Sequence, residues 1–152
     1  MITQLVKNRI EKKLEMIFSR LPHIKKLVGN DNKTIKDDVD MSAVIERYFQ
    51  IVVDSAVSIN EQIISSLDLE TPEDYRGTFF IISKSGVIPT PFAEKISGSV
   101  GLRNIIVHAY EEVKQDKMID DIRNNIYQYD EYVAYIKKFL DLNWVLYLWF
   151  QF

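Results

Sequence analysis

Apolar residues recur every three to five positions along three long stretches of the chain, and this spacing limits the fold more than any other feature. The stretches cover residues 2–28, 40–67 and 116–142. Such spacing places apolar side chains along one side of an α-helix, and no segment alternates as strands joined by hairpin turns do. The 152 residues are also the size of one domain. We therefore expect a single all-α domain over residues 1–152, a bundle of four to five helices in which two long ones form an antiparallel hairpin.

Proline and polar residues mark where the first helices should begin and end. Pro22 predicts a kink or an early stop in the first helix. The segment GNDNKTIKDD, residues 29–38, reads as a polar turn region. Asp40 or Ser42 is suited to cap the second long helix, since a short side-chain oxygen can accept a hydrogen bond from a free backbone N–H.

Two further helix starts carry a threonine followed by a proline. Thr71 is the predicted cap of a short helix that should stop near Gly86, a glycine suited to a left-handed backbone. Thr90 is the predicted cap of the next helix, which contains Gly98 and Gly101. These glycines either weaken the middle of that helix or let another backbone approach closely.

The composition excludes several kinds of chemistry. The chain has no cysteine, so disulfides, thiolate zinc sites and cysteine nucleophiles are ruled out. It has two histidines, His23 and His108, far apart in sequence, and none of the phosphate-loop, dinucleotide-binding, serine-hydrolase or HExxH motifs. The acidic run around Asp38 fits a solvated loop that caps a helix better than a magnesium site. We therefore expect no metal and no cofactor, and a formal net charge of −3 shows no overall basic coat for nucleic acid.

The two ends of the chain bear on its location. The first residues are amphipathic and charged, unlike a signal peptide, so we expect a cytoplasmic protein. The last residues, LNWVLYLWFQF at 142–152, form an apolar tail of uncertain role. This run is about half the length that crosses a bilayer, so packing on the domain or on a second subunit is favoured over membrane contact. An appended non-native segment is a further explanation of it.

The segment RNIIVHAY, residues 103–110, places an arginine, an asparagine, a histidine and a tyrosine close together. Histidine suits proton transfer near neutral pH, and the arginine fork matches phosphate oxygens. Together, these groups are able to cleave RNA without a metal: a base takes the 2′-hydroxyl proton, the oxygen attacks phosphorus, and arginine stabilises the developing charge. The alternative is an ordinary amphipathic helix with incidental polar residues.

Helix geometry restricts how this cluster works. Asn104 and His108 are four residues apart and share one face, whereas Arg103 lies about 140° around the axis from His108. Arg103 and His108 therefore meet only if the helix ends near His108 or if a second copy of the chain supplies the arginine. Lys114, Lys117 and Arg123 are candidates for additional positive charge near the site.

The segment GLRNIIVHAYEEV resembles the signature of HEPN-domain proteins, specifically the R-x4-H-x-Y motif of the HepT-like toxin family. Arg103, His108 and Tyr110 occupy the three motif positions, and Asn104 matches the residue that commonly follows the arginine. The segment from Val44 to Ser66 also resembles the family's second helix, with Arg47 and Gln50 in matching places, and residues 74–89 resemble the following segment. The likeness extends to about Leu140 and does not include the apolar tail.

This resemblance implies a HEPN-like antiparallel bundle that forms a homodimer, with the two motifs facing each other in a cleft. It implies a metal-independent endoribonuclease that is the toxin of a toxin–antitoxin pair, with RNA as substrate. The implied partner is an MNT-type nucleotidyltransferase antitoxin, which neutralises the toxin by transferring AMP to Tyr110. Arg103 would contact the scissile phosphate, His108 would act as acid or base, and Asn104 would support them. HEPN domains also include binding modules, so the alternative is a non-catalytic helical adaptor that binds a nucleotidyltransferase or a nucleotide.

Overall fold

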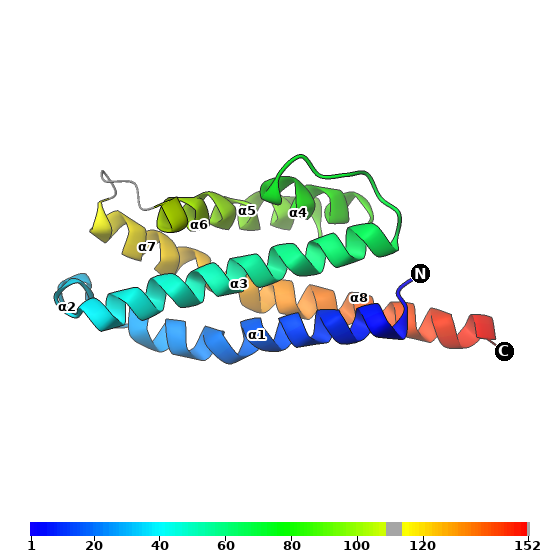
Figure 1. The fold of residues 1–152 in the computed structure, drawn as a ribbon, viewed down its shortest axis with the longest axis horizontal. Coiled ribbons are helices and arrows are strands. Elements are labelled where there is room, and N and C mark those ends of the chain that lie inside the picture. Colours follow the sequence, from blue (N-terminus) through cyan, green and yellow to red (C-terminus); the bar gives the residue numbers. More distant parts are fainter. Residues whose placement is uncertain (109–113, 152) are drawn as a thin grey trace.

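The computed structural model describes the backbone of residues 1–108 and 114–151 and the side chains of residues 1–108 and 114–142. The described backbone folds into eight helical segments (Figure 1): α1 Gln4–Val28, α2 Asn32–Asp37, α3 Val39–Ser66, α4 Tyr75–Lys84, α5 Thr90–Ile96, α6 Gly98–His108, α7 Gln115–Asn125 and α8 Gln128–Gln151. The described part contains no strand, and the predicted all-α class is confirmed. Within the described residues, none of these helices has the length and apolarity needed to span a membrane.

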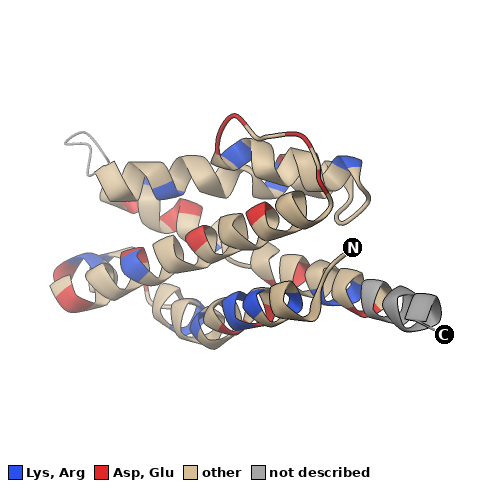
Figure 2. Ribbon diagram, turned by 45° about the vertical axis from the view of Figure 1, so that its right-hand side comes forward, with Lys and Arg blue, Asp and Glu red and all other residues tan. Residues whose placement is uncertain are grey.

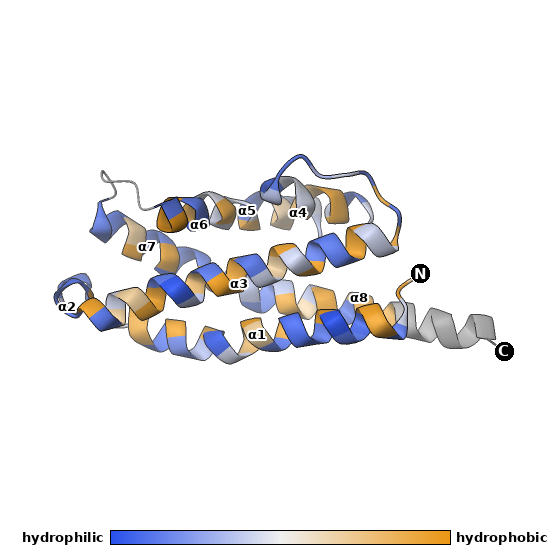
Figure 3. Ribbon diagram, viewed as in Figure 1, coloured by the Kyte–Doolittle hydropathy of each residue, from blue (hydrophilic) through white to orange (hydrophobic). Residues whose placement is uncertain are grey.

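The two longest helices form the predicted antiparallel hairpin. α1 and α3 pack side by side along most of their length and run in opposite directions, with α2 at the connection between them (Figure 1). α8 lies against α1, while α4, α5 and α6 lie on the other side of α3. Hydrophobic and hydrophilic residues alternate in bands along α1 and α3 (Figure 3), as one-sided burial requires.

The first helix continues through Pro22, so of the two predicted alternatives, a kink or an early stop, the early stop is wrong. α1 ends only at Val28, and Pro22 lies within it. The residues around the proline explain this, because Leu21 and Ile24 are buried while the proline ring is exposed. Burial of the apolar side chains on both sides of Pro22 outweighs the backbone hydrogen bond that proline cannot donate.

Residues 29–38 are not a simple turn, because they contain the short helix α2. The side chain of Asp31 caps it by accepting a hydrogen bond from the backbone N–H of Thr34 at 2.8 Å, and Ile35 is fully buried. The next cap is Asp38, whose carboxylate accepts from the N–H of Met41 at 3.0 Å. The prediction that Asp40 or Ser42 caps α3 is therefore wrong by a few residues, although the acidic run does cap this helix.

The two threonine–proline starts are also displaced. Asp74, not Thr71, caps α4, since its carboxylate accepts a hydrogen bond from the N–H of Gly77 at 2.7 Å. α5 begins at Thr90 itself, with Pro89 in the capping position. The predicted end of α4 is confirmed, because Gly86 has a left-handed backbone with φ of 79° and follows the helix directly.

A buried polar network ties three helices together. The Tyr132 hydroxyl on α8 donates to Asn60 Oδ1 on α3 at 2.7 Å and lies 3.0 Å from the carbonyl oxygen of Ala56. Asn60 in turn donates from Nδ2 to Thr78 Oγ1 on α4 at 3.1 Å. Burial raises the pKa of Tyr132 well above its usual value, because the phenolate would lose its hydration.

Replacing Tyr132 by phenylalanine should lower the free energy of unfolding by about 1–3 kcal/mol. The change removes one hydroxyl and leaves buried acceptors of Asn60 and Ala56 with fewer partners, and the penalty for such groups is of this size. Urea unfolding followed by circular dichroism measures the difference. The matched control is Tyr127→Phe, at a position that is 56 % exposed, where a change of less than about 0.5 kcal/mol is expected.

Candidate functional site

Helix α6 positions the predicted site residues at one end of the bundle. Arg103 and Asn104 are half-buried on this helix, and His108 is its last residue, with an exposed side chain. Tyr110, the predicted modification site, lies outside the described residues. The structure therefore tests the placement of three of the four predicted site residues.

The guanidinium of Arg103 is fixed by a carboxylate on α3. Nε of Arg103 donates to Asp54 Oδ1 at 2.7 Å, and Nη2 donates to Oδ2 at 3.3 Å. The Arg103 side chain is 15 % exposed and that of Asp54 is 37 % exposed, so the pair is partly shielded from water. A two-point, charge-assisted contact of this kind restrains the direction of the guanidinium plane.

Two further side chains complete the surroundings of Arg103. Asn104 accepts a hydrogen bond at Oδ1 from Arg103 Nη1 at 3.2 Å. The ring of Tyr75, at the start of α4, lies with its centroid 5.5 Å from Cζ of Arg103. Three of the five guanidinium N–H groups thus bond to Asp54 and Asn104, and no hydrogen bond to the described residues engages the other two.

His108 lies five positions after Arg103 and is the last residue of α6. Arg103 turns toward α3, whereas the imidazole at the end of α6 is exposed to solvent. The two positions lie about 140° apart around the helix axis, and α6 ends at His108, which is one of the two conditions under which Arg103 and His108 were expected to meet. The structure places Asn104 beside Arg103.

The exposed face of α6 consists of small and apolar residues leading up to His108. Gly98, Gly101, Ile105 and His108 follow one another at intervals of three, four and three residues, which is the spacing of one helix face. A Cβ atom added to Gly98 or Gly101 would have no neighbour within 4 Å in the described part of this chain. Of the two alternatives given for these glycines, a close backbone approach is not made by the described residues of the chain, and the face is open to a contact from outside them.

Two residues of the arginine site were missed by sequence reasoning. Asp54 is the one charged residue in the largely apolar run IVVDSAV, and a charge in such a place signals a specific partner. Tyr75 directly follows the Asp74 cap, and its side chain is 43 % exposed. The signal from Asp54 was present in the sequence, whereas the contact between Tyr75 and Arg103 depends on the path of the loop before α4.

The predicted basic surroundings of the site are only partly present. Arg123 donates to the backbone oxygens of Val28 and Asn30 and to Asp120, so it holds α7 to the end of α1. Lys117 is paired with Asp121 at 2.7 Å, and Lys114 is exposed. The prediction that Arg123 supplies positive charge to the site is wrong, because hydrogen bonds fix its guanidinium to another part of the bundle. Figure 2 shows basic residues gathered along α1 instead.

Other polar residues lie on α3, the helix that carries Asp54. Burial raises the pKa of Glu46 on this helix. Arg47 donates to Gln50 at 3.3 Å, which links the two α3 residues of the family resemblance.

In the part of the chain with described side chains, no group of three or more histidine, aspartate and glutamate residues is placed to hold a metal ion.

The family model described as "Ribonuclease HepT-like" matches residues 17–136 of this chain. The chain is 28 % identical over 131 residues to "tRNA nuclease HepT" of Aphanizomenon flos-aquae (strain 2012/KM1/D3), covering 86 % of this chain and 89 % of that one. It is 23 % identical over 129 residues to "mRNA nuclease HepT" of Shewanella oneidensis, covering 81 % of this chain and 97 % of that one. Among solved structures, the fold is similar to the tri-AMPylated Shewanella oneidensis HEPN toxin in complex with MNT antitoxin, with a TM-score of 0.77, 23 % identity, and coverage of 86 % of this chain and 97 % of that one.

Proposed function

The chain belongs to the Ribonuclease HepT-like family, and from this membership we propose that it is a metal-independent endoribonuclease and the toxin of a toxin–antitoxin pair. In this proposal residues 1–152 form one HEPN domain that acts on RNA in the cytoplasm. The observation that carries the proposal is the state of Arg103, whose guanidinium is held by Asp54, Asn104 and Tyr75, with two N–H groups not engaged by the described residues. A preorganised cation on the same helix as an exposed imidazole suits phosphate chemistry.

The proposed reaction needs only groups that the chain and the RNA provide. His108 takes the proton of a 2′-hydroxyl, the oxygen attacks the adjacent phosphorus, and the bond to the 5′ oxygen breaks. The leaving oxygen receives a proton from a histidine in its acid form, and the products are a 2′,3′-cyclic phosphate and a 5′-hydroxyl. The open N–H groups of Arg103 bind the non-bridging phosphate oxygens, where negative charge increases in the transition state.

A homodimer would bring the separated groups together. The positions of Arg103 and His108 lie about 140° apart around the axis of α6, so two chains packed through their α6 helices would place an arginine of one and a histidine of the other around one phosphate. The face of Gly98, Gly101 and Ile105 supports this geometry, because the two glycines let a second helix approach closely and Ile105 offers an exposed apolar side chain. The two motifs would then share one cleft across a two-fold axis.

Replacing Gly101 by leucine should dissociate this dimer. The new side chain has no neighbour to displace in its own chain, so the fold is retained, but it would collide with a helix packed at close distance. We expect the molar mass in size-exclusion chromatography with light scattering to fall from that of two chains to that of one. The control is Lys12→Leu on the exposed side of α1, which should leave the mass unchanged. An intact dimer in the Gly101 variant would place the interface elsewhere.

Asp54 has the role of a positioning residue, because it acts through Arg103 and not on RNA. Replacing it by asparagine keeps the shape but removes the charge that restrains the guanidinium, so cleavage should fall about tenfold to a hundredfold, the range seen for groups that orient functional residues. The loss should appear in kcat more than in KM, and Asp54→Glu should recover part of it. Glu61→Gln, an exposed change on the same helix, is the control and should keep full activity.

The proposed partner is an MNT-type nucleotidyltransferase antitoxin. The structure of the Shewanella oneidensis HEPN toxin with such an antitoxin, in which the toxin is tri-AMPylated, supports this assignment. In the proposed step the Tyr110 hydroxyl attacks the α-phosphorus of ATP, pyrophosphate leaves, and AMP becomes bonded to the tyrosine oxygen. An AMP group two residues from His108 would add negative charge and bulk beside the phosphate site.

The experiment that tests this function measures RNA cleavage before and after treatment with the transferase. Purified chain should cleave RNA, and incubation with the MNT-type enzyme and ATP should abolish cleavage and increase the mass by whole AMP units. Omission of ATP provides the control and should leave cleavage intact. Cleavage that persists after AMP has been added would contradict the proposed neutralisation.

A further inference from the structure

A row of basic residues lies on the side of α1 that borders α3. Arg9, Lys13 and Arg20 are four and seven residues apart, which places them on one face of the helix. Lys12 lies beside Lys13, and Figure 2 shows basic residues gathered along this helix. The direction of the face follows from Arg20, whose Cζ lies 5.6 Å from the centroid of the Tyr48 ring on α3. We call Arg9, Lys12, Lys13 and Arg20 the α1 basic stripe.

The positive charges of the stripe have no carboxylate partner among the side chains that the structure describes. The ion pairs found there use other cations, such as Lys7, which lies 3.9 Å from Glu11. Arg20 donates to an uncharged group, the carbonyl oxygen of Met16, at 3.1 Å. The stripe is therefore a local excess of positive charge on a chain whose formal net charge is −3.

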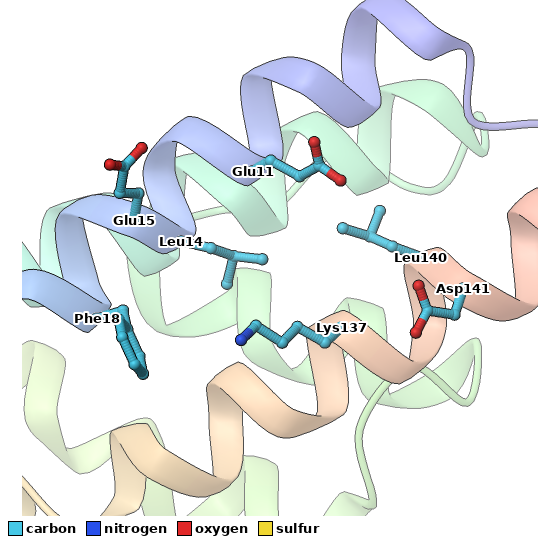
Figure 4. A pocket seen from close by; sticks show the side chains of 7 residues that line it. All are labelled: Glu11, Leu14, Glu15, Phe18, Lys137, Leu140 and Asp141. Carbon is cyan, nitrogen blue, oxygen red and sulfur yellow. The ribbon is translucent and has the colours of Figure 1, made fainter.

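Acidic residues of α1 and α3 lie on other sides of these helices. Glu11 and Glu15 line a groove between α1 and α8 (Figure 4). Asp54 is bound to Arg103 of α6, and its position lies about 120° around α3 from that of Tyr48. These carboxylates therefore lie away from the stripe and leave its positive potential in place. The neighbours of Tyr48 on its own face of α3 are uncharged: Val44, Ile51 and Ser55.

The shape of the stripe fits a linear polyanion. Arg9 and Arg20 are 11 positions apart in the sequence. At a rise of about 1.5 Å per residue, the stripe is roughly 16 Å long. A row of cations of this kind follows the backbone of a nucleic acid, in which negative phosphates repeat at regular intervals. The centre of a protein–protein interface, in contrast, is depleted of lysine. The charge and the shape of the stripe therefore favour RNA over an acidic protein.

The stripe lies within reach of an RNA strand bound at Arg103. α3 lies between α1 and α6 (Figure 1), and Arg103 contacts one flank of α3 while Arg20 contacts the other. A helix with its side chains is about 10–12 Å wide. A strand that leaves the phosphate at Arg103 therefore crosses α3 within a few nucleotides and then follows α1. The stripe also stays accessible in a dimer packed through α6, because that helix lies on the other flank of α3.

We propose that the α1 basic stripe binds the phosphate backbone of RNA outside the cleavage site and holds a strand whose scissile phosphate lies at Arg103. This inference rests on the proposed function, because it takes RNA as the substrate. The contacts are electrostatic and do not depend on base sequence, since phosphates carry none of the sequence information. Each contact releases counterions from the RNA, so the affinity falls with salt in proportion to the number of contacts.

Neutralisation of two stripe residues tests this contact without any cleavage. The ligand is a fluorescent single-stranded RNA with 2′-O-methyl groups throughout, which has no free 2′-hydroxyl to attack phosphorus. Arg9→Gln with Lys12→Gln removes two exposed cations and keeps good helix formers. In fluorescence anisotropy, the slope of log affinity against log salt should become shallower by about 1.4, at about 0.7 for each phosphate contact. The ratio of wild-type to variant affinity should therefore fall about sevenfold between about 50 and 200 mM salt.

Two further variants are matched controls. Lys95→Gln with Lys138→Gln makes the same change in net charge at exposed positions on α5 and α8, and it should keep the wild-type affinity and slope. Arg9→Lys with Lys12→Arg keeps both charges of the stripe and should bind RNA as the wild type does, because the contact depends on charge. Thermal melts of all variants show whether the fold is retained.

The proposal is overturned if the neutralised stripe keeps the wild-type affinity and slope, if the control pair on α5 and α8 loses as much, or if the wild type does not bind the oligonucleotide. It is also overturned if the stripe variant loses binding to the MNT-type transferase while RNA binding is unchanged, because the surface then serves a protein partner. Failure of the proposed function gives a different result: the wild type then leaves unmodified RNA intact, while the difference in salt slope between stripe and control variants persists.

Discussion

His108→Ala should reduce RNA cleavage by about 10²–10⁴-fold, which is the usual contribution of general acid–base catalysis. The imidazole is exposed at the end of α6, so the substitution changes a reactive group at the surface and not a side chain of the core. Single-turnover cleavage of a labelled RNA measures the chemical step, and a thermal melt that matches the wild type shows that the fold is unchanged. RNA binding should change much less than the rate.

Arg103→Ala should produce a loss of similar size through a different route. Loss of one preorganised charge at a developing oxyanion costs about 10²–10³-fold. This substitution also leaves Asp54 without its partner, so its melting temperature has to be compared with that of Asp54→Asn. His23→Ala is the matched control for the histidine change, because His23 is the other histidine of the chain and lies exposed on α1. If His23→Ala and His108→Ala cleaved equally fast, His108 would have no role in the reaction.

Tyr110→Phe should abolish the incorporation of AMP by the transferase. The substitution removes the hydroxyl oxygen to which AMP would be bonded, so the expected loss is complete and not partial. Intact-protein mass spectrometry after incubation with the transferase and ATP measures it, and radiolabelled ATP provides a second readout. The RNA cleavage of this variant should then persist in the presence of transferase and ATP.

The control for Tyr110→Phe is another exposed tyrosine. Tyr127 is 56 % exposed, and Tyr127→Phe should accept as much AMP as the wild type. AMP added to the Tyr110 variant at the wild-type level would assign the modification to a different residue. Partial incorporation would mean that more than one hydroxyl accepts AMP.

The sequence predicted the fold class because burial on one side of a helix leaves a periodic trace. Ile10, Leu14 and Ile17 on α1 are buried, as the spacing of apolar residues indicated. The number of helices was harder to predict. Ser97 ends α5 and Ile126 ends α7, although the spacing of apolar residues continues across both positions and suggests one longer helix in each case. Helix starts were displaced by up to three or four residues, because several side chains near each start are able to accept the capping hydrogen bond and only one has an extended backbone at that point.

The sequence offers candidate residues for the site but not their contacts. The motif selects Arg103 and His108, and helix geometry places the two positions about 140° apart around one helix axis. Arg103 is restrained by Asp54, which is 49 positions away in the sequence, and by Tyr75, which is 28 positions away. No local sequence pattern reveals contacts between residues this far apart. Arg123 shows the opposite case, in which a basic residue near the motif in sequence is used to hold α7 to α1.

The most direct test of the proposed function is the cleavage of RNA by the purified wild-type chain in excess EDTA, with the ends of the products identified. Cleavage by a 2′-hydroxyl with histidine and arginine predicts full activity in EDTA and products with a 5′-hydroxyl and a 2′,3′-cyclic phosphate. Products with a 5′-phosphate and a 3′-hydroxyl, or activity lost in EDTA and restored by a divalent cation, would contradict this chemistry. No cleavage in either condition would favour the non-catalytic adaptor.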